Sequence, residues 1–297
     1  MSSATSDLSV IVPVTRLGGK EQNLRSWLLK LPRENVAVFL VHDVQDIITS
    51  EILSSILSEA RNPNIQMFEA TLNSPGLTRN VAIDCIASEW TWFVDADDLP
   101  LISEALVIIK EANHHTEVII GRYGIRSVDG KSRAQPEIPP QTLESVAYTP
   151  GIWRMIFRSR SIGDIRFKSF RMGEDQLFLL EYGIFHRKIQ FVERQIYTYF
   201  LHVEGQLTSR RKDILEISKV ISRTLEIFRK SNLDEKNLVG VMFLRQVITL
   251  AKNLNLKKLP QLLHKGLKIV LKFEPNELVI LLKSFLIIGK LKWKSNG

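Results

Sequence analysis

The sequence predicts an α/β fold in which a largely parallel sheet is covered by helices on both faces and is followed by a helical C-terminal region. Apolar runs that are typical of buried strands occur at 8–14, 36–41, 65–70 and 90–94. Between them, apolar residues recur at helical spacing, as in 24–31 and 47–60. Strands that alternate with helices indicate a parallel sheet, and near-continuous apolar strands lie in sheets buried on both faces. The 297 residues, 44% of them apolar, suffice for one sizeable core and a smaller second unit.

The alternation continues beyond the fourth strand. The pattern predicts a helix at 102–111 and a strand at 118–126. The polar, proline-rich stretch 127–140 is predicted to be a loop that borders a binding site, because loops of this length in compact domains are commonly functional. Two further strand-like runs occur within 189–200.

From Lys212 onward the apolar residues recur only at helical spacing. Residues 209–297 contain 19 Lys and Arg against 7 Asp and Glu, whereas residues 1–208 contain 21 against 25. We therefore predict a domain at 1–208 and a basic helical region at 209–297. The lysines of 257–297, with Trp293, suit a helix that lies on an anionic membrane surface. The alternative is a helix packed on its neighbours with a solvated lysine face.

Cysteine content and hydropathy bear on location. The single cysteine, Cys85, cannot form an internal disulfide and is expected to be a small core residue, as in a reducing compartment. The polar first residues predict no secretory signal, and no run reaches the ~20 apolar residues that a membrane-spanning helix needs. We expect a cytoplasmic protein that is peripheral at the inner face of the plasma membrane where its basic region meets lipid.

The segment 75–100 carries the main functional signal. In it, a helix whose apolar face is formed by Val81, Ile83, Ile86 and Ala87 leads into an apolar strand. This strand ends at Asp95-Ala96-Asp97-Asp98. Three carboxylates within four residues are costly to hold together unless a positive charge lies among them. Hard divalent cations prefer carboxylate oxygens and commonly bridge a protein to phosphates. The turn therefore predicts a Mg²⁺ or Mn²⁺ site for a nucleotide diphosphate, and the alternative is a solvated acidic loop.

The combination of motifs resembles the family 2 glycosyltransferases with the GT-A fold. Gly76 and Arg79-Asn80 stand before the acidic turn as in the central motif of that family. Gly173-Glu174-Asp175 with a following aromatic residue, and then Tyr197-Thr198-Tyr199 with His202, follow in the family's order. The resemblance spans roughly residues 8–208 and implies a Rossmann-like mixed sheet flanked by helices.

The resemblance implies a nucleotide-sugar site beyond the carboxyl ends of the first strands. The residues that it assigns to this site are Pro13, Val14, Thr15, Asp43, Gly76, Arg79, Asn80, Asp95, Ala96 and Asp97. The family's aspartate at Asp43 binds uracil, but Val44-Gln45-Asp46 replaces the usual Gly-Ser turn, which leaves the choice of UDP over another nucleotide open. As alternatives, Asp43 is the N-cap of the helix at 47–60, and Arg79 forms a surface salt bridge instead of binding a diphosphate.

Catalytic and metal-binding roles follow from the same resemblance. Asp95, Asp97 and His202 would hold the metal ion, and Asp175 would act as the general base while Glu174 binds the acceptor or orients that base. As alternatives, the two adjacent carboxylates only stabilise a helix N-terminus, and His202 is an ordinary loop residue.

The implied activity is that of an inverting glycosyltransferase. Such an enzyme moves a sugar from a nucleotide-sugar donor, here a UDP-sugar, to a glycan or lipid-linked acceptor in cell-surface polysaccharide synthesis. The alternative from another class is a catalytically degenerate GT-A domain that serves as a binding or scaffold protein. Nucleic acid is not an expected partner, because no basic patch with interleaved aromatic residues occurs. The sequence leaves the sugar, the acceptor, the linkage and a homo-oligomeric state open.

Overall fold

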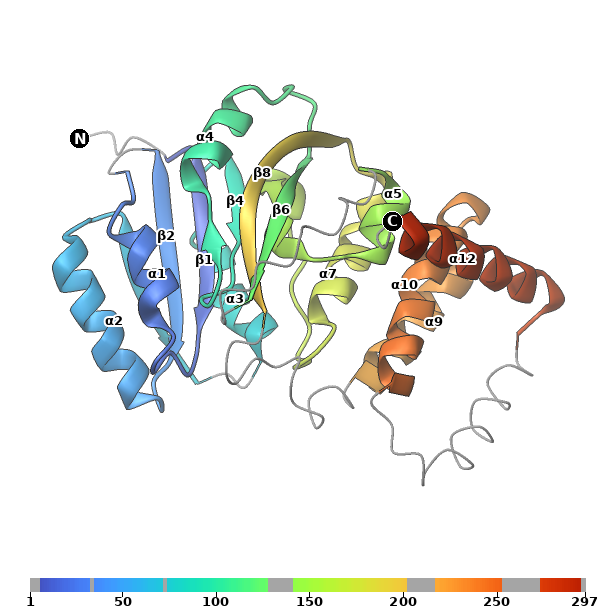
Figure 1. Ribbon diagram of the computed structural model, residues 1–297, viewed down its shortest axis with the longest axis horizontal. Helices are drawn as coiled ribbons and strands as arrows, with labels where there is room; N and C mark the ends of the chain where they lie inside the picture. The colour runs from blue at the N-terminus through green and yellow to red at the C-terminus, as the bar shows by residue number, and fades with distance from the viewer. Residues whose placement is uncertain are drawn as a thin grey trace. The chain divides into compact units, whose positions relative to one another are not determined.

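The computed structural model describes residues 6–32, 35–71, 74–127, 141–201, 217–252 and 273–294. Their contacts group them into two compact units, shown in Figure 1. Among the described residues, the first unit comprises 6–127 and 151–201, and the second comprises 141–150 and 217–294. The domain boundary that the sequence predicts after residue 208 falls outside the described residues and stays a prediction.

The first unit is built on a mixed eight-stranded sheet of order β3-β2-β1-β4-β7-β6-β8-β5. Its strands are β1 (Leu8–Val14), β2 (Val36–Asp43), β3 (Ile65–Ala70), β4 (Trp90–Phe93), β5 (Leu99–Pro100), β6 (Val118–Ser127), β7 (Met155–Arg158) and β8 (Ile189–Leu201). The first four pair in parallel, β7 runs antiparallel to β4 and β6, β8 runs parallel to β6, and β5 runs antiparallel to β8. The predicted α/β class with a mixed sheet is therefore confirmed.

Helices cover both faces of this sheet (Figure 1). The helices of the unit are α1 (Glu21–Leu28), α2 (Ile47–Ala60), α3 (Pro75–Ile83), α4 (Ile102–Lys110), α6 (Ser159–Ile162) and α7 (Glu174–Tyr182), with the short 3-10 turns η1 (Ile152–Arg154) and η2 (Ile184–His186). Because β1 to β4 run parallel, their carboxyl ends lie at the same edge of the sheet. Ligands of α/β folds bind beyond this edge.

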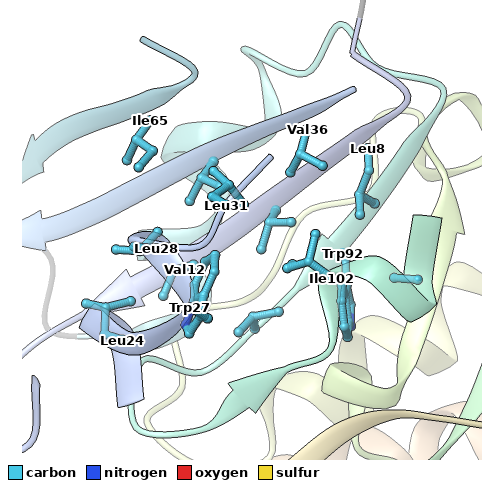
Figure 2. Close-up of a cluster of buried hydrophobic side chains, with 14 of the residues drawn as sticks. Leu8, Val12, Leu24, Trp27, Leu28, Leu31, Val36, Ile65, Trp92 and Ile102 are labelled. Atoms are coloured by element: carbon cyan, nitrogen blue, oxygen red, sulfur yellow. The ribbon is translucent and has the colours of Figure 1, made fainter. Parts of the chain in front are cut away.

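One core lies between the sheet and helices α1, α2 and α4. Figure 2 shows how Trp27 and its neighbours on α1 point toward Val12 of β1 and the strands beside it. Alternate residues of a strand face opposite sides, so the same alternation that buries Val12 and Trp92 here places Phe93 on the other face. The strand residues that the sequence marks as apolar thus divide between two cores.

The second core lies on the opposite face and is aromatic. The ring of Phe93 lies 5.7 Å from that of Phe157, 5.2 Å from that of Phe167 and 5.6 Å from that of Phe178, all at steep angles. Edge-to-face rings attract through their quadrupoles in addition to the apolar area that they bury. This cluster links the end of β4 to the start of α7 and so fixes the two segments that carry the predicted acidic residues.

Two local predictions in the segment 75–100 are wrong. The helix after Pro75 ends at Ile83, whereas the sequence predicts that its apolar face continues to Ala87. Cys85 lies in the turn that follows and is exposed, so it is not a core residue. The apolar pattern that suggests a longer helix belongs to the connection into β4.

Two further predictions concern later segments. The two strand-like runs within 189–200 form one continuous strand, β8. Of the predicted loop 127–140, only residue 127 is described.

The second unit is helical. It contains α5 (Leu143–Tyr148), α9 (Ile217–Lys230), α10 (Leu233–Lys252) and α12 (Pro275–Lys294). Its core includes an aromatic group in which the ring of Phe228 lies 6.5 Å from that of Phe243 and 6.3 Å from that of Phe273. Among the described residues, no helix has the length and apolarity that crossing a membrane requires.

Candidate active site

The acidic turn follows β4 directly and is held in place by backbone contacts on both sides. Val94 donates to the carbonyl of Ile11 over 3.0 Å, so the end of β4 stays joined to β1. The amide of Asp98 donates to the carbonyl of Asp95 over 3.2 Å, which closes the turn. The next two residues form β5, whose Leu99 pairs with Thr198 of β8. The turn is thereby fixed between two strands that are far apart in the sequence.

Asp98 differs from the other carboxylates of the turn because it is completely buried. It accepts hydrogen bonds from the hydroxyl of Tyr197 at 2.8 Å and from the amide of Phe200 at 2.7 Å. Burial, followed by the charges of Asp95 and Asp97, raises the pKa of Asp98 to about 9. Asp98 is therefore neutral near pH 7 and fastens the turn to β8, so Asp95 and Asp97 carry the charge that can face a ligand.

Arg79 supplies the positive charge that the acidic cluster requires. Its side chain is 4% exposed, and its guanidinium donates to Asp95 at 2.8 Å, to Asp175 at 3.0 Å and to Glu174 at 3.1 Å. Burial alone lowers the pKa of Arg79, but the charges of Asp175, Asp95 and Glu174 outweigh it and hold the pKa above its ordinary value. The surface salt bridge considered for Arg79 is wrong, because its guanidinium is buried and pairs with three carboxylates.

The structure thus brings together four residues that the sequence assigns to two functions. Asp95 and Arg79 come from the predicted donor site, and Glu174 and Asp175 come from the predicted catalytic pair. One guanidinium contacts all three carboxylates, which places the acidic turn and the start of α7 within one hydrogen-bonded cluster.

Close contacts of α3 explain why Arg79 reaches this position. A Cβ atom on Gly76 would lie 2.7 Å from Cβ of Phe167, so only glycine lets the start of α3 approach the segment before α7. Asn80 donates to the carbonyl of Phe167 and accepts from its amide, each at 2.9 Å. Ser74 donates to the carbonyl of Phe170 over 2.8 Å. Gly76 and Asn80 therefore hold the segment that carries Glu174 and Asp175, and whether they also touch a nucleotide stays a prediction.

Glu174 and Asp175 begin α7 after Gly173, which has a φ of 84° and turns the chain into the helix. Burial, with the charge of Asp175, raises the pKa of Glu174. Burial also raises the pKa of Asp175, to about 6, against the opposing charge of Arg79. The side chain of Asp175 is 24% exposed and that of Glu174 is 9% exposed. Asp175 is thus an accessible carboxylate whose pKa lies close to neutrality, as a general base requires.

The donor set of the acidic turn suits a hard divalent cation shared with phosphate. Asp95 and Asp97 are both partly exposed, and Mg²⁺ commonly uses one or two carboxylates while phosphate oxygens and water complete its coordination. Among the described residues, no group of three or more His, Cys, Asp and Glu side chains is arranged to hold a metal ion. His202, the third predicted ligand, lies outside the described residues.

The remaining predicted donor-site residues lie at the ends of β1 and β2. Pro13 is partly exposed, Thr15 is exposed, and Val14 is fully buried, so of these three residues only Pro13 and Thr15 are accessible at this edge of the sheet. The backbone of Asp43 pairs with Ala70 of β3 at the same edge of the sheet. Ala96 is partly buried within the acidic turn.

The N-cap of α2 is Asp46, so the alternative in which Asp43 caps this helix is wrong. The carboxylate of Asp46 accepts from the amide of Thr49 at 3.2 Å and from the amide of Arg16 at 2.7 Å. The second of these bonds ties the loop after β1 to the start of α2. Asp46 thus shapes the loop at the predicted nucleotide site.

An aromatic stack beside the acidic turn was not anticipated. Trp153 stacks on Tyr197 at 4.9 Å and on Tyr199 at 5.5 Å, and the amide of Asp95 donates to the hydroxyl of Tyr197 at 3.2 Å. Tyr197 and Tyr199 belong to a Tyr-x-Tyr motif that the sequence shows, but Trp153 precedes it by more than forty positions. Only the pairing of β7 and β8 with their neighbours brings the three rings together.

A large part of the sequence matches one known family of proteins. Residues 9–177 match the family described as glycosyl transferase family 2, and this match covers more than half of the chain. The chain therefore belongs to glycosyl transferase family 2. The sequence-based resemblance to this family is confirmed.

Individual relatives share the fold. The chain is 26% identical over 232 residues to the poly(ribitol-phosphate) beta-N-acetylglucosaminyltransferase TarS of Staphylococcus aureus, an alignment that covers 72% of this chain and 39% of that protein. The crystal structure of S. aureus TarS 1–349 in complex with UDP-GlcNAc is similar with a TM-score of 0.64 at 19% identity, over 97% of this chain and 81% of that one. A mannosyltransferase from Pyrobaculum calidifontis in complex with GDP-Man and Mn²⁺ gives 0.57 at 14% identity, over 98% and 87%.

Proposed function

We propose that this chain is an inverting glycosyltransferase that moves a sugar from a UDP-sugar to a glycan or lipid-linked acceptor in cell-surface polysaccharide synthesis. The observation that carries the proposal is the meeting of Asp95 and Asp175 at the guanidinium of Arg79. The first carboxylate belongs to a turn suited to a metal-bound diphosphate, and the second is an accessible base. A displacement at the anomeric carbon needs these two groups near one another.

The residues divide the work as follows. Asp175 accepts the proton of the acceptor hydroxyl as that oxygen attacks the anomeric carbon, and Glu174 orients Asp175 through their shared partner Arg79. Asp95 and Asp97 would hold Mg²⁺ or Mn²⁺, and the bound ion would neutralise negative charge on the leaving diphosphate. The bond to the acceptor oxygen forms while the bond to the diphosphate oxygen breaks, so the configuration at the anomeric carbon inverts.

Relatives support the choice of donor. A solved structure of S. aureus TarS contains UDP-GlcNAc, and the one from P. calidifontis contains GDP-Man with Mn²⁺. Asp43 stands at the end of β2, where a base-binding residue belongs in this fold. We therefore propose a uridine nucleotide, with UDP-GlcNAc as the first donor to test. The name of TarS, a poly(ribitol-phosphate) beta-N-acetylglucosaminyltransferase, supports the proposed acceptor class. The chain aligns with 39% of the length of TarS.

The test is transfer and donor hydrolysis with a panel of UDP- and GDP-sugars, with and without Mn²⁺. Asp175→Asn is expected to lower kcat by about 10²- to 10⁴-fold, because general base catalysis contributes that much, while donor binding by calorimetry stays close to the parent value. Glu181→Gln on the same helix is the matched control and should leave both unchanged. Parent-level turnover by Asp175→Asn would contradict the assignment of the base.

A scaffold function is the second candidate, and one observation favours it. The guanidinium of Arg79 pairs with three carboxylates of the chain itself, so part of the negative charge of the cluster is balanced without any ligand. A scaffold would bind a nucleotide or glycan yet show no metal-stimulated hydrolysis with any member of the panel.

A further inference from the structure

Helix α12 has one face packed against α10 and another that faces outward. Its inward side chains are spaced three or four residues apart, and Ser284 donates to the carbonyl of Asn237 on α10 over 3.0 Å. The buried residues of this face are Glu277, Ile280, Ser284, Ile288 and Leu291. Because one side of α12 packs against α10, its opposite side is left facing outward.

The outward face of α12 is apolar. We call it the α12 stripe, and it consists of Leu278, Val279, Leu282, Phe285 and Leu286, which are 37%, 50%, 66%, 57% and 64% exposed. These positions recur at intervals of three, four and seven residues, so they fall on one arc of the helix. Scattered apolar side chains are normal on a protein surface, whereas five on consecutive turns form a continuous patch that marks an interaction site.

Lysines border the α12 stripe. Lys283 and Lys290 are exposed and lie about two helical turns apart, on the edge of the arc beside Leu286. Both line a groove of about 270 Å³ together with Asn237, Leu286 and Ile287. The one acidic residue of the helix, Glu277, is turned inward and lies 3.8 Å from Arg229. No carboxylate of the described part of α12 therefore opposes the lysines on the outward side.

We propose that the α12 stripe docks on the surface of an anionic lipid bilayer, with the helix lying in the plane of the interface. The apolar side chains would enter the boundary between headgroups and acyl chains, and Lys283 and Lys290 would contact lipid phosphates at its edge. A second copy of the chain fits less well, because packing two stripes together would bring lysines of like charge close without acidic partners. The inference is independent of the proposed catalytic function, since it rests on the second unit alone.

The experiment measures binding of the full chain to vesicles by flotation. Vesicles of phosphatidylcholine alone are compared with vesicles of phosphatidylcholine and phosphatidylglycerol in equal parts. The parent should partition onto the anionic vesicles and detach at high salt. Lys283→Gln with Lys290→Gln should weaken binding about 30-fold, because each lysine near an anionic surface contributes about fivefold.

Apolar substitutions test the stripe itself. Leu282→Ser with Phe285→Ser should reduce binding about tenfold or more, and both side chains are exposed, so the fold should survive. Leu233→Ser is the matched control, since Leu233 is 69% exposed but lies on α10, outside the stripe. Circular dichroism verifies that each variant is folded.

Two results would overturn the proposal. One is binding of the Leu282→Ser, Phe285→Ser variant to anionic vesicles at the parent level. The other is a parent that sediments as an oligomer, with the same substitutions converting it to a monomer, because the stripe would then be an interface between copies.

Discussion

The guanidinium of Arg79 donates to Asp95 over 2.8 Å. Asp95 follows β4 and Arg79 lies in α3, so this bond ties the acidic turn to a helix, and the other guanidinium nitrogen extends the link to α7. In the sequence a metal ion was expected to provide the positive charge among the carboxylates. The structure shows that the chain itself provides a positive charge, the guanidinium of Arg79. A metal ion held by Asp95 and Asp97 would therefore share the carboxylate of Asp95 with Arg79.

Replacement of Arg79 should alter both stability and the pH dependence of activity. Arg79→Gln leaves buried carboxylates without their partner and is expected to lower the free energy of unfolding by about 3 kcal/mol. Because the charge of Arg79 lowers the pKa of Asp175, its removal should raise that pKa from about 6 and move the acidic limb of the kcat profile to higher pH. Rates measured across the pH range check the shift, and urea unfolding checks the stability.

Two other variants show whether the effect is specific to Arg79. Arg79→Lys keeps the charge and should shift the limb less, although a single ammonium group cannot reproduce the geometry of the fork. Arg25→Gln removes an exposed pair with Glu59 and should cost less than about 1 kcal/mol without moving the profile. An unshifted profile in Arg79→Gln would show that Arg79 does not govern the protonation of Asp175.

Gly76 should tolerate no side chain. In Gly76→Ala, the new Cβ would lie 2.7 Å from Cβ of Phe167 and 3.1 Å from Cγ of Glu174, so α3 must move away from α7. We expect a loss of about 1 to 3 kcal/mol in stability, as for other overpacked cores, together with reduced kcat because Arg79 moves with the helix. Thermal unfolding and initial rates measure the two effects.

Gly289→Ala is the matched control for Gly76→Ala. Gly289 lies in α12, and a Cβ there meets nothing within 4 Å. Alanine is favoured over glycine in a helix, so this change should stabilise the chain by about 0.5 to 1 kcal/mol. Equal effects of the two substitutions would mean that the close approach of α3 and Phe167 is not what holds the site together.

Local patterns predicted much of the fold, whereas contacts between distant residues were beyond them. The bounds of β1, α2 and β3 match those predicted, because each is set by a short apolar period with a clear end. The connection of Arg79 to Glu174 joins residues 95 positions apart, and no local pattern encodes it. Cys85 was misplaced because an apolar run continues past the true end of α3. The burial of Asp98 depends on Tyr197, which lies beside Asp98 only because β8 pairs with β5.

Removal of the metal ion should abolish transfer if the acidic turn holds it. A chelator is expected to stop turnover, and Mn²⁺ or Mg²⁺ should restore it. Asp97→Asn is the sharper test, because Asp95 also pairs with Arg79 and its loss would disturb the whole cluster. We expect Asp97→Asn to raise the Mn²⁺ concentration needed for half-maximal activity at least about tenfold, since a carboxylate ligand binds a hard cation much better than an amide. Metal-independent turnover in the parent would contradict the assignment.

Asp98→Asn should change how stability depends on pH. The pKa of Asp98 in the folded chain is raised to about 9, first by burial and then by the charges of Asp95 and Asp97, whereas an unfolded aspartate titrates near ~3.9. Between these values the folded chain retains a proton that the unfolded chain has lost, so the stability contributed by neutral Asp98 declines as pH rises. Asparagine is neutral throughout and keeps a carbonyl that can accept from Phe200 or Tyr197.

The stability of Asp98→Asn relative to the parent should therefore increase with pH. Urea unfolding of both proteins on either side of neutrality measures this difference, and its sign is the decisive quantity. Tyr197→Phe serves as a companion variant, because it removes the hydroxyl that donates to Asp98 without changing the charge of the turn. If the difference between Asp98→Asn and the parent stayed constant or decreased as pH rose, Asp98 would be ionised in the folded chain and the acidic turn would carry three charges instead of two.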